Sequence, residues 1–308
     1  MTQFQRLGLS DSIVFKCFRS RRTRRAAEAC RKRQQLGWWE WPRARRAEGS
    51  TVVRKSMLLI VNADDLGASE AINDETFALM ESGLVTSATL MANAPAFEHA
   101  VKHIRRFPNC SFGVHLNLTA FPPLSRSTNL EPVLRNGEFF RELLTKRLLR
   151  ELRSELEQEL ILQVQRVFDA GVLVTHFDSH HFIHVSPHLF SVVKAVQRYF
   201  GVRKLRSTVE VLSERRVLHT LKGRLFGYAL RKVYTTVSPD GWCEVRRFHA
   251  ALVRNALPRF RCLELMVHPG SRDARDVEEI AILRSNWQQL LPADVQLGSY
   301  RLLRTASP

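Results

Sequence analysis

Short apolar runs recur along the chain after Met57, and amphipathic stretches separate most of them. A continuous apolar run bounded by polar residues is typical of a parallel strand covered on both faces. The sequence predicts strands at 58–63, 85–92, 111–118, 172–177, 203–207, 262–267 and 295–302. Helices are expected at 70–82, 95–106, 141–169, 188–200, 245–257 and 276–291.

This alternation defines the fold class that we expect. About seven β–α units over about 250 residues are typical of an α/β protein with a TIM-like (β/α) barrel. We therefore predict one domain over 57–308 with a complete or incomplete barrel of this kind. A doubly wound sheet is the alternative. Ser69 is expected to cap the helix that follows it, because its side chain can accept a backbone hydrogen bond there.

The first 56 residues differ from this domain in their charge. The chain of 308 residues carries a net charge of +17, and residues 1–56 hold 15 Lys and Arg but only 4 Asp and Glu. We interpret 1–56 either as translation upstream of a true start at Met57, or as a disordered basic extension. A third interpretation is a targeting segment or an arm that binds nucleic acid or anionic surfaces.

The cysteine content and the hydropathy of the chain bear on the cellular compartment in which we expect the protein. Five cysteines have no CxxC spacing, which favours buried thiols in a reducing compartment. The sequence has no run of 18 apolar residues, so we expect no membrane span and a cytoplasmic location.

Acidic and histidine residues stand at the ends of four of the apolar runs. Asp64 and Asp65 end the first run, His115 lies in the third, and His268 follows the run at 262–267. Because the carboxyl ends of parallel strands meet at one face, we expect these side chains to share a site. The two adjacent carboxylates can face it together only if the strand breaks, and Gly67 permits that turn.

The densest cluster lies at the end of the run at 172–177. Its titratable members are His176, Asp178, His180, His181 and His184. Carboxylate and imidazole groups together favour a divalent metal site. The HExxH pattern of zinc proteases, the GxSxG elbow, GxGxxG and the Walker motif are all absent from the sequence.

Taken together, these stretches resemble the YdjC-like carbohydrate deacetylases, which include the ChbG chitooligosaccharide deacetylases and the HpnK hopanoid-associated proteins. The matching stretches are LLIVNADDLG at 58–67, GLVTSATLM at 83–91, GVHLNLT at 113–119, THFDSHHFIH at 175–184 and ELMVHPG at 264–270. The resemblance implies a distorted (β/α) barrel, often a homodimer. One departure is Phe182, where many members of the family have histidine.

The resemblance also implies roles for individual residues. Asp65, His115 and His180 would bind the metal, with Asp64 as general base and His268 as general acid. Substrate-binding or supporting roles fall to His176, Asp178 and His184. Separately from the resemblance, Arg206 is a candidate substrate contact, because the basic residues of the 203–244 region favour a phosphorylated or acidic sugar. The family is described with Mg²⁺, but imidazole ligands suit Zn²⁺ or another transition metal better, so the metal stays open.

The expected reaction is removal of an N-acetyl group from an amino sugar, such as a chitooligosaccharide or a glycolipid-linked N-acetylglucosamine. The alternatives are another metal hydrolase, such as a phosphoesterase, and a binding protein that uses the Arg-rich segment. We expect no nucleic-acid partner apart from that segment.

Overall fold

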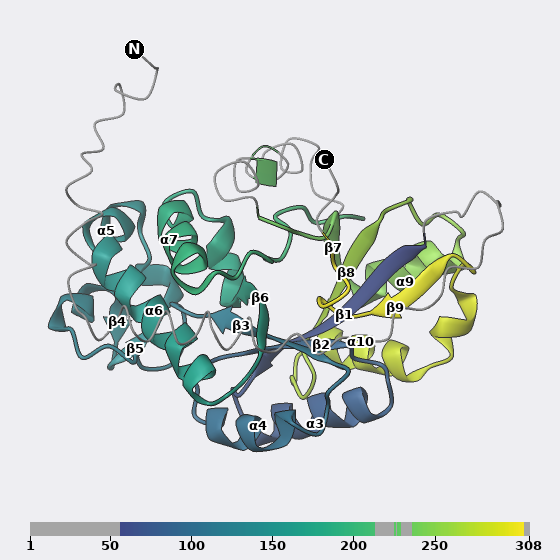
Figure 1. Cartoon of the computed structure of the whole chain (residues 1–308), viewed down its shortest axis with the longest axis horizontal. Helices are drawn as coiled ribbons and strands as arrows, with labels where there is room; N and C mark the ends of the chain where they lie inside the picture. Colours follow the sequence, from purple (N-terminus) through teal and green to yellow (C-terminus); the bar gives the residue numbers. More distant parts are fainter. Residues whose placement is uncertain (1–55, 213–224, 226, 229–235, 305–308) are drawn as a thin grey trace, which may run out of the picture. The chain divides into compact units, whose positions relative to one another are not determined.

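Seven parallel strands form the sheet at the centre of the computed structural model (Figure 1). The structure describes residues 56–212, 225, 227–228 and 236–304, so the predicted extension at 1–56 lies almost wholly outside it. The strand order is β6-β3-β2-β1-β8-β7, and β9 also pairs with β1. The strands are β1 (Met57–Leu66), β2 (Ser87–Leu90), β3 (Ser111–Leu116), β6 (Val174–Ser179), β7 (Gly241–Glu244), β8 (Cys262–Val267) and β9 (Val295–Gly298).

Helices follow most of these strands, as the alternating pattern predicts. The described α-helices are α3 (Glu70–Glu81), α4 (Phe97–Ile104), α5 (Lys146–Glu151), α6 (Arg153–Asp169), α7 (Phe190–Phe200), α9 (Val245–Val253) and α10 (Ala274–Arg284). The Ser69 side chain accepts a hydrogen bond from the backbone N–H of Ile72 at 3.2 Å, which confirms the predicted cap. Among the described residues, no helix is long and apolar enough to cross a bilayer.

The two edge strands are joined through one irregular segment. Leu205 bridges to Phe177 of β6, and Glu210 bridges to Trp242 of β7. Residues 204–210 therefore connect the two edges of the sheet in place of a full strand, so the barrel is incomplete. The α/β fold predicted from the sequence is confirmed.

Three of the predicted elements differ from the structure. The 203–207 run makes only isolated bridges, from Leu205 to Phe177 of β6 and from Lys204 to Val237. The expected helix at 141–169 divides at Leu152, where the backbone (φ −96°, ψ 14°) leaves the helical region. The last run ends its strand at Gly298, so Tyr300 lies in the turn that follows β9.

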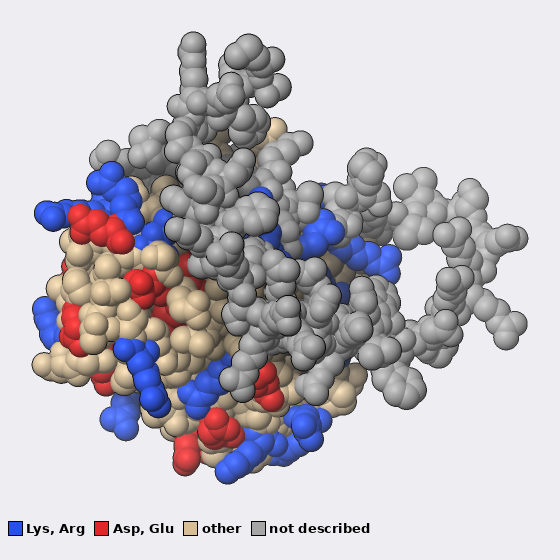
Figure 2. All heavy atoms as spheres, turned by 60° about the vertical axis from the view of Figure 1, so that its left-hand side comes forward, with Lys and Arg blue, Asp and Glu red and all other residues tan. Residues whose placement is uncertain are grey.

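The part of the surface shown in Figure 2 that the structure describes carries basic and acidic side chains interspersed. This agrees with the moderate charge that remains once the first 56 residues are set aside. A mixed surface of this kind is ordinary for a globular domain.

Candidate metal centre and active site

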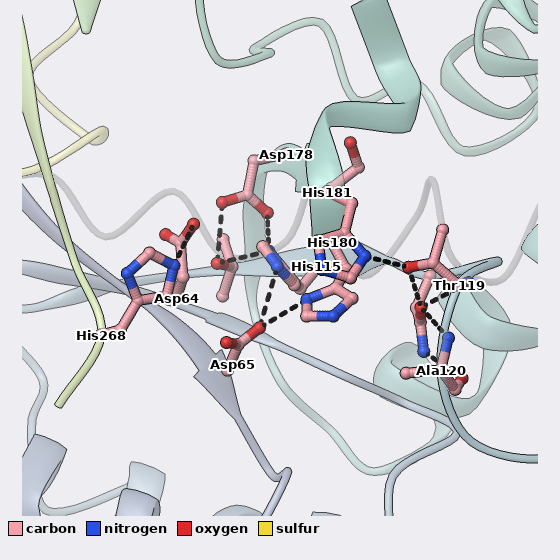
Figure 3. Close-up of polar contacts among 12 residues, drawn as sticks. Asp64, Asp65, His115, Thr119, Ala120, Asp178, His180, His181 and His268 are labelled. Carbon is pink, nitrogen blue, oxygen red and sulfur yellow. Dashed lines mark hydrogen bonds and ion pairs between the residues drawn. The ribbon is translucent and has the colours of Figure 1, made fainter. Parts of the chain in front are cut away.

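The carboxyl ends of β1, β3, β6 and β8 bring the predicted site residues together (Figure 3). Asp64 and Asp65 end β1, His115 is in β3, His180 follows β6, and His268 follows β8. All five side chains are within one network of contacts.

A left-handed residue turns the two neighbouring carboxylates toward the same site. Asp65 has φ +62°, and the pairing of β1 with β2 shifts register between Ala63 and Leu66. The sequence predicted a break at Gly67, which does have φ +99°, but Asp65 itself supplies the first turn. Aspartate tolerates this region better than most residues because its short side chain can bond locally.

Asp65, His115 and His180 lie close enough together to share one cation. Asp65 Oδ1 is 3.2 Å from His115 Nε2 and 3.0 Å from His180 Nδ1. The three donor atoms all lie within 4.8 Å of one another. Ligand atoms about 2.1 Å from an ion lie about 3.0–3.4 Å apart, so the spacing fits one divalent metal.

A buried carboxylate supports His115 from behind. The His115 Nδ1–H group donates to Asp178 Oδ1 at 2.7 Å, and the Thr89 hydroxyl donates to Asp178 Oδ2 at 2.8 Å. This carboxylate–histidine arrangement orients the ring of a metal ligand. Burial lowers the pKa of His115, but Asp178, Asp65 and Asp64 together outweigh it and raise that pKa to about 10.

A second group, Asp64 with His115 and Asp178, also has metal-binding spacing and is fully buried. Arg206 already neutralises its carboxylates, because Arg206 Nη2 is 2.6 Å from Asp64 Oδ1 and 3.1 Å from Asp178 Oδ2. The group with Asp65 and His180 is therefore the better metal site.

Arg206 holds Asp64 with both terminal nitrogens, each 2.6 Å from one carboxylate oxygen. Burial raises the pKa of Asp64, but the charge and hydrogen bonds of Arg206, together with the charges of His115 and His268, outweigh it and lower that pKa to about 2. Asp64 is thus ionised throughout the physiological range. Asn62 adds a third donor, with its Nδ2 at 2.9 Å from Asp64 Oδ1.

His268 stands on the other side of Asp64. Its Nε2 is 3.9 Å from Asp64 Oδ2, and its Nδ1 is 3.5 Å from Asp276 Oδ1 in the first turn of α10. Burial lowers the pKa of His268, but the hydrogen bond to Asp276 and the charge of Asp64 raise it to about 9. The ring is therefore protonated at neutral pH, as a proton donor requires.

The residues expected to bind substrate or to support the site are fully buried. His176, Asp178, His184 and Arg206 have 0% exposure, so they support the site from behind its surface. The His184 Nδ1 atom lies 2.6 Å from Ser179 Oγ, and burial lowers the pKa of His184 to about 3.

Phe182, the departure noted in the sequence, packs against an aromatic partner. Its ring stacks on Trp242 of β7 with centroids 4.6 Å apart, and the Arg206 guanidinium lies 5.8 Å from its centroid. Phe182 and His181 both have left-handed backbones, with φ +56° and +50°. His181 Nδ1 lies 3.0 Å from Thr119 Oγ1, beside the metal ligands (Figure 3).

Several supporting residues were not predicted from the sequence. Asn62 could have been found, because it lies two positions before Asp64 and so shares its face of β1. Glu264 could also have been found, because it is a carboxylate inside the apolar run at 262–267. Tyr300 and Thr89 act through contacts that are distant along the chain, and Asp276 acts through His268.

The fold and the site define an α/β protein with an Asp–His–His candidate metal centre at the carboxyl ends of its strands. The chain belongs to the YdjC-like protein family, whose model matches residues 58–292.

Known relatives are carbohydrate deacetylases. The chain is 43% identical over 150 residues to the carbohydrate deacetylase of Geobacillus stearothermophilus, covering 48% of this chain and 60% of that protein. It is 30% identical over 227 residues to the carbohydrate deacetylase of Clostridium beijerinckii, covering 71% and 84%. The chitooligosaccharide deacetylase of Salmonella typhimurium is 30% identical over 223 residues, covering 70% and 82%.

Among solved structures, the chain resembles a candidate cellobiose-phosphate cleavage protein of Enterococcus faecalis. The TM-score is 0.64 at 22% identity, covering 80% of this chain and 98% of that one. This similarity concerns the fold alone.

Proposed function

We propose that this protein is a metal-dependent hydrolase that removes the N-acetyl group from an amino sugar. The observation that carries the proposal is the convergence of the Asp65–His115–His180 group with the Asp64–His268 pair. The names of its relatives support the reaction class and favour a chitooligosaccharide or a related N-acetylglucosamine glycan.

Asp65, His115 and His180 would hold the divalent metal, Mg²⁺ by family resemblance or Zn²⁺ by its ligands. When bound, such an ion supplies Lewis acidity toward the acetyl carbonyl and toward water. Two imidazoles and one carboxylate leave coordination positions for both.

Asp64 is the proposed general base. Arg206 keeps it ionised, and its place next to Asp65 puts it beside the metal ligands. The same ion pair makes Asp64 a weak base, so proton transfer to it depends on a water of lowered pKa.

His268 is the proposed general acid. Its ring is cationic at neutral pH and Asp276 holds it 3.9 Å from Asp64, so it can deliver a proton to the departing amine. That proton is required because an amide anion is a poor leaving group.

A two-metal phosphoesterase is less well supported. Its second ion would need ligands such as Asp64 and Asp178, and Arg206 neutralises both of these in the described site. The homodimer and the cytoplasmic location remain predictions.

The test is acetate release by the full chain from N,N′-diacetylchitobiose, its 6-phosphate and a glycolipid-linked N-acetylglucosamine. Each sugar is assayed with Mg²⁺, with Zn²⁺ and with chelator. We expect metal-dependent release from at least one of them. The absence of release from every sugar, by folded protein with metal bound, would contradict the proposal.

A further inference from the structure

Tyr300 is fully buried and is fixed by contacts to four different parts of the fold. Its hydroxyl donates to Glu264 Oε2 at 2.5 Å, and its ring stacks on His176 with centroids 3.6 Å apart and planes 8° apart. Its backbone N–H donates to Ser111 Oγ at 3.1 Å, and its carbonyl accepts from Lys204 Nζ. A tyrosine held at so many points has little freedom to move.

One route leads from the Tyr300 hydroxyl to Asp64. Glu264 Oε1 accepts from Arg206 Nε at 2.9 Å and from Nη2 at 2.7 Å. The terminal nitrogens of the same guanidinium bind both oxygens of Asp64. Because Glu264 fixes the inner edge of the planar guanidinium, it also sets the direction of the outer edge.

A second route leads from the Tyr300 ring to Asp64. The stacked His176 ring has Nε2 3.3 Å from Asn62 Oδ1, and Asn62 Nδ2 donates to Asp64 Oδ1 at 2.9 Å. The two routes close a ring of six buried residues. Its members are Asp64, Arg206, Glu264, Tyr300, His176 and Asn62.

We propose that Tyr300 is a positioning residue, which sets the orientation of Asp64 through Glu264 and Arg206 on one side and through His176 and Asn62 on the other. The proposal rests on the proposed function in one respect, namely that Asp64 acts as the base. Lys204 strengthens the link, because it binds the Tyr300 carbonyl and lies two residues before Arg206.

Loss of the hydroxyl alone should loosen this arrangement. Without it, Glu264 Oε2 becomes a buried acceptor without its tyrosine donor, which is unfavourable. Glu264 is then held only through its Oε1 atom by Arg206, so the direction of the guanidinium is less firmly fixed.

The first experiment replaces the hydroxyl in the full chain, as Tyr300→Phe, and leaves the stacked ring in place. We expect kcat on the best acetylated sugar to fall about tenfold, the effect of one misplaced hydrogen bond. KM and the affinity for Zn²⁺ should stay unchanged, because Tyr300 contacts neither the ligand group nor the open face.

A control variant separates positioning from general stability. Trp287→Phe removes a buried aromatic hydrogen bond, Nε1 to Leu283 O at 3.1 Å, from a residue outside the ring of six. It should lower thermal stability and leave kcat unchanged.

A double mutant tests the route. If Tyr300 acts through Glu264, adding Tyr300→Phe to Glu264→Gln lowers kcat no further than Glu264→Gln alone. Multiplied effects of the two substitutions would overturn the proposed route. If Tyr300→Phe fails to fold, Glu264→Gln alone tests the proposal, because glutamine keeps the shape of the side chain. An unchanged kcat of Glu264→Gln would then overturn the proposal.

A measurement that does not depend on catalysis tests the positioning role separately from the proposed deacetylase function. Proton exchange of the Arg206 Nε–H group is followed by nitrogen-15 NMR in metal-free protein, with the signal assigned by its loss in Arg206→Lys. We expect exchange at least about tenfold faster in Tyr300→Phe than in the wild type.

If the wild type releases no acetate but exchange accelerates, the deacetylase proposal fails and the positioning role stands. If the wild type is active and Tyr300→Phe keeps both its kcat and its slow exchange, the positioning role is overturned.

Discussion

Arg206 binds Asp64 through two parallel hydrogen bonds of 2.6 Å, and both side chains are almost completely removed from solvent. Parallel bonds of this kind are strong and fix direction as well as distance. The pair therefore sets both the charge of the proposed base and the direction in which its oxygens point.

Replacing Arg206 with methionine should destabilise the fold. It would leave Asp64, Asp178 and Glu264 buried without their shared cation. Breaking a buried ion pair in this way costs about 3–5 kcal/mol in the free energy of unfolding. Urea unfolding measures it, and a methionine variant as stable as the wild type would show that the cluster contributes no net stability.

Asp64→Asn should remove catalysis and keep the metal. The amide keeps the shape of the side chain but cannot take a proton, so we expect kcat to fall by about 10²–10⁴-fold. Acetate release measures the loss of activity, and Zn²⁺ titration calorimetry on the same preparation measures whether metal binding is kept. Full activity of Asp64→Asn would remove the base role.

Asp178→Asn should weaken metal binding although Asp178 is not one of the three proposed ligands. The His115 ring would lose the carboxylate that accepts its Nδ1–H at 2.7 Å. Loss of such a partner typically lowers metal affinity about 10–100-fold. Competition with a chromogenic chelator measures the affinity, with Asp169→Asn on α6 as the control because Asp169 contacts none of the three ligands in the described structure.

The pH dependence of the reaction should carry the signature of His268. In metal-free protein its pKa is raised from 6.5 to about 9, so the proposed acid is protonated below pH 9 and activity falls as the pH rises through that value. The same shift stabilises the fold fully below pH 6.5, and this contribution is lost as the pH approaches 9.

Asp276→Asn removes the main partner that raises this pKa, so the alkaline limb should move toward neutral pH by about one unit. Glu278→Gln, which changes a mostly exposed carboxylate on the same helix, should leave the profile in place. If Asp276→Asn does not move the pH at which activity falls on the alkaline side, His268 is not the group whose titration causes that fall.

Gly113→Ala should strain the interior beneath the site. A Cβ atom at this position would lie 2.7 Å from His176 Cε1 and 2.7 Å from the His176 carbonyl oxygen. We expect a loss of about 1–3 kcal/mol in the free energy of unfolding. Gly83→Ala, with φ +70° and no atom within 4 Å, should cost only about 1 kcal/mol through its backbone. Equal losses would mean that His176 yields to the methyl group.

The parts of this fold that were predicted from sequence are those with long apolar runs. β8 is buried along its whole length, and β1 at every residue except the half-buried Leu58 and Asp65, so their apolar runs are unambiguous. β7 was not predicted, because its four residues, GWCE, carry no periodic signal. Its position follows from pairing with β8, which a local pattern cannot show.

The same distinction between local and tertiary signals applies to the residues of the candidate site. Asp65, His115 and His180 interrupt or follow apolar runs with polar groups, so the sequence marks them directly. Glu264 and Tyr300 were not predicted, because their roles depend on a hydrogen bond between β8 and the segment after β9. Only tertiary structure brings those two segments together.

The pairing of Met57 with Val295 joins the first described strand to the last. A contact between such distant residues forms slowly, because the ends of a long loop must meet before any contact compensates the entropy lost. β1 carries both Asp64 and Asp65, so the strand that bears the chemistry receives its β8 and β9 neighbours late in folding. During synthesis, the edge of β1 that pairs with β8, and residues 57–60 of the opposite edge that pair with β9, stay open until the ribosome has delivered those two strands. Aggregation during this interval is the hazard that the topology creates.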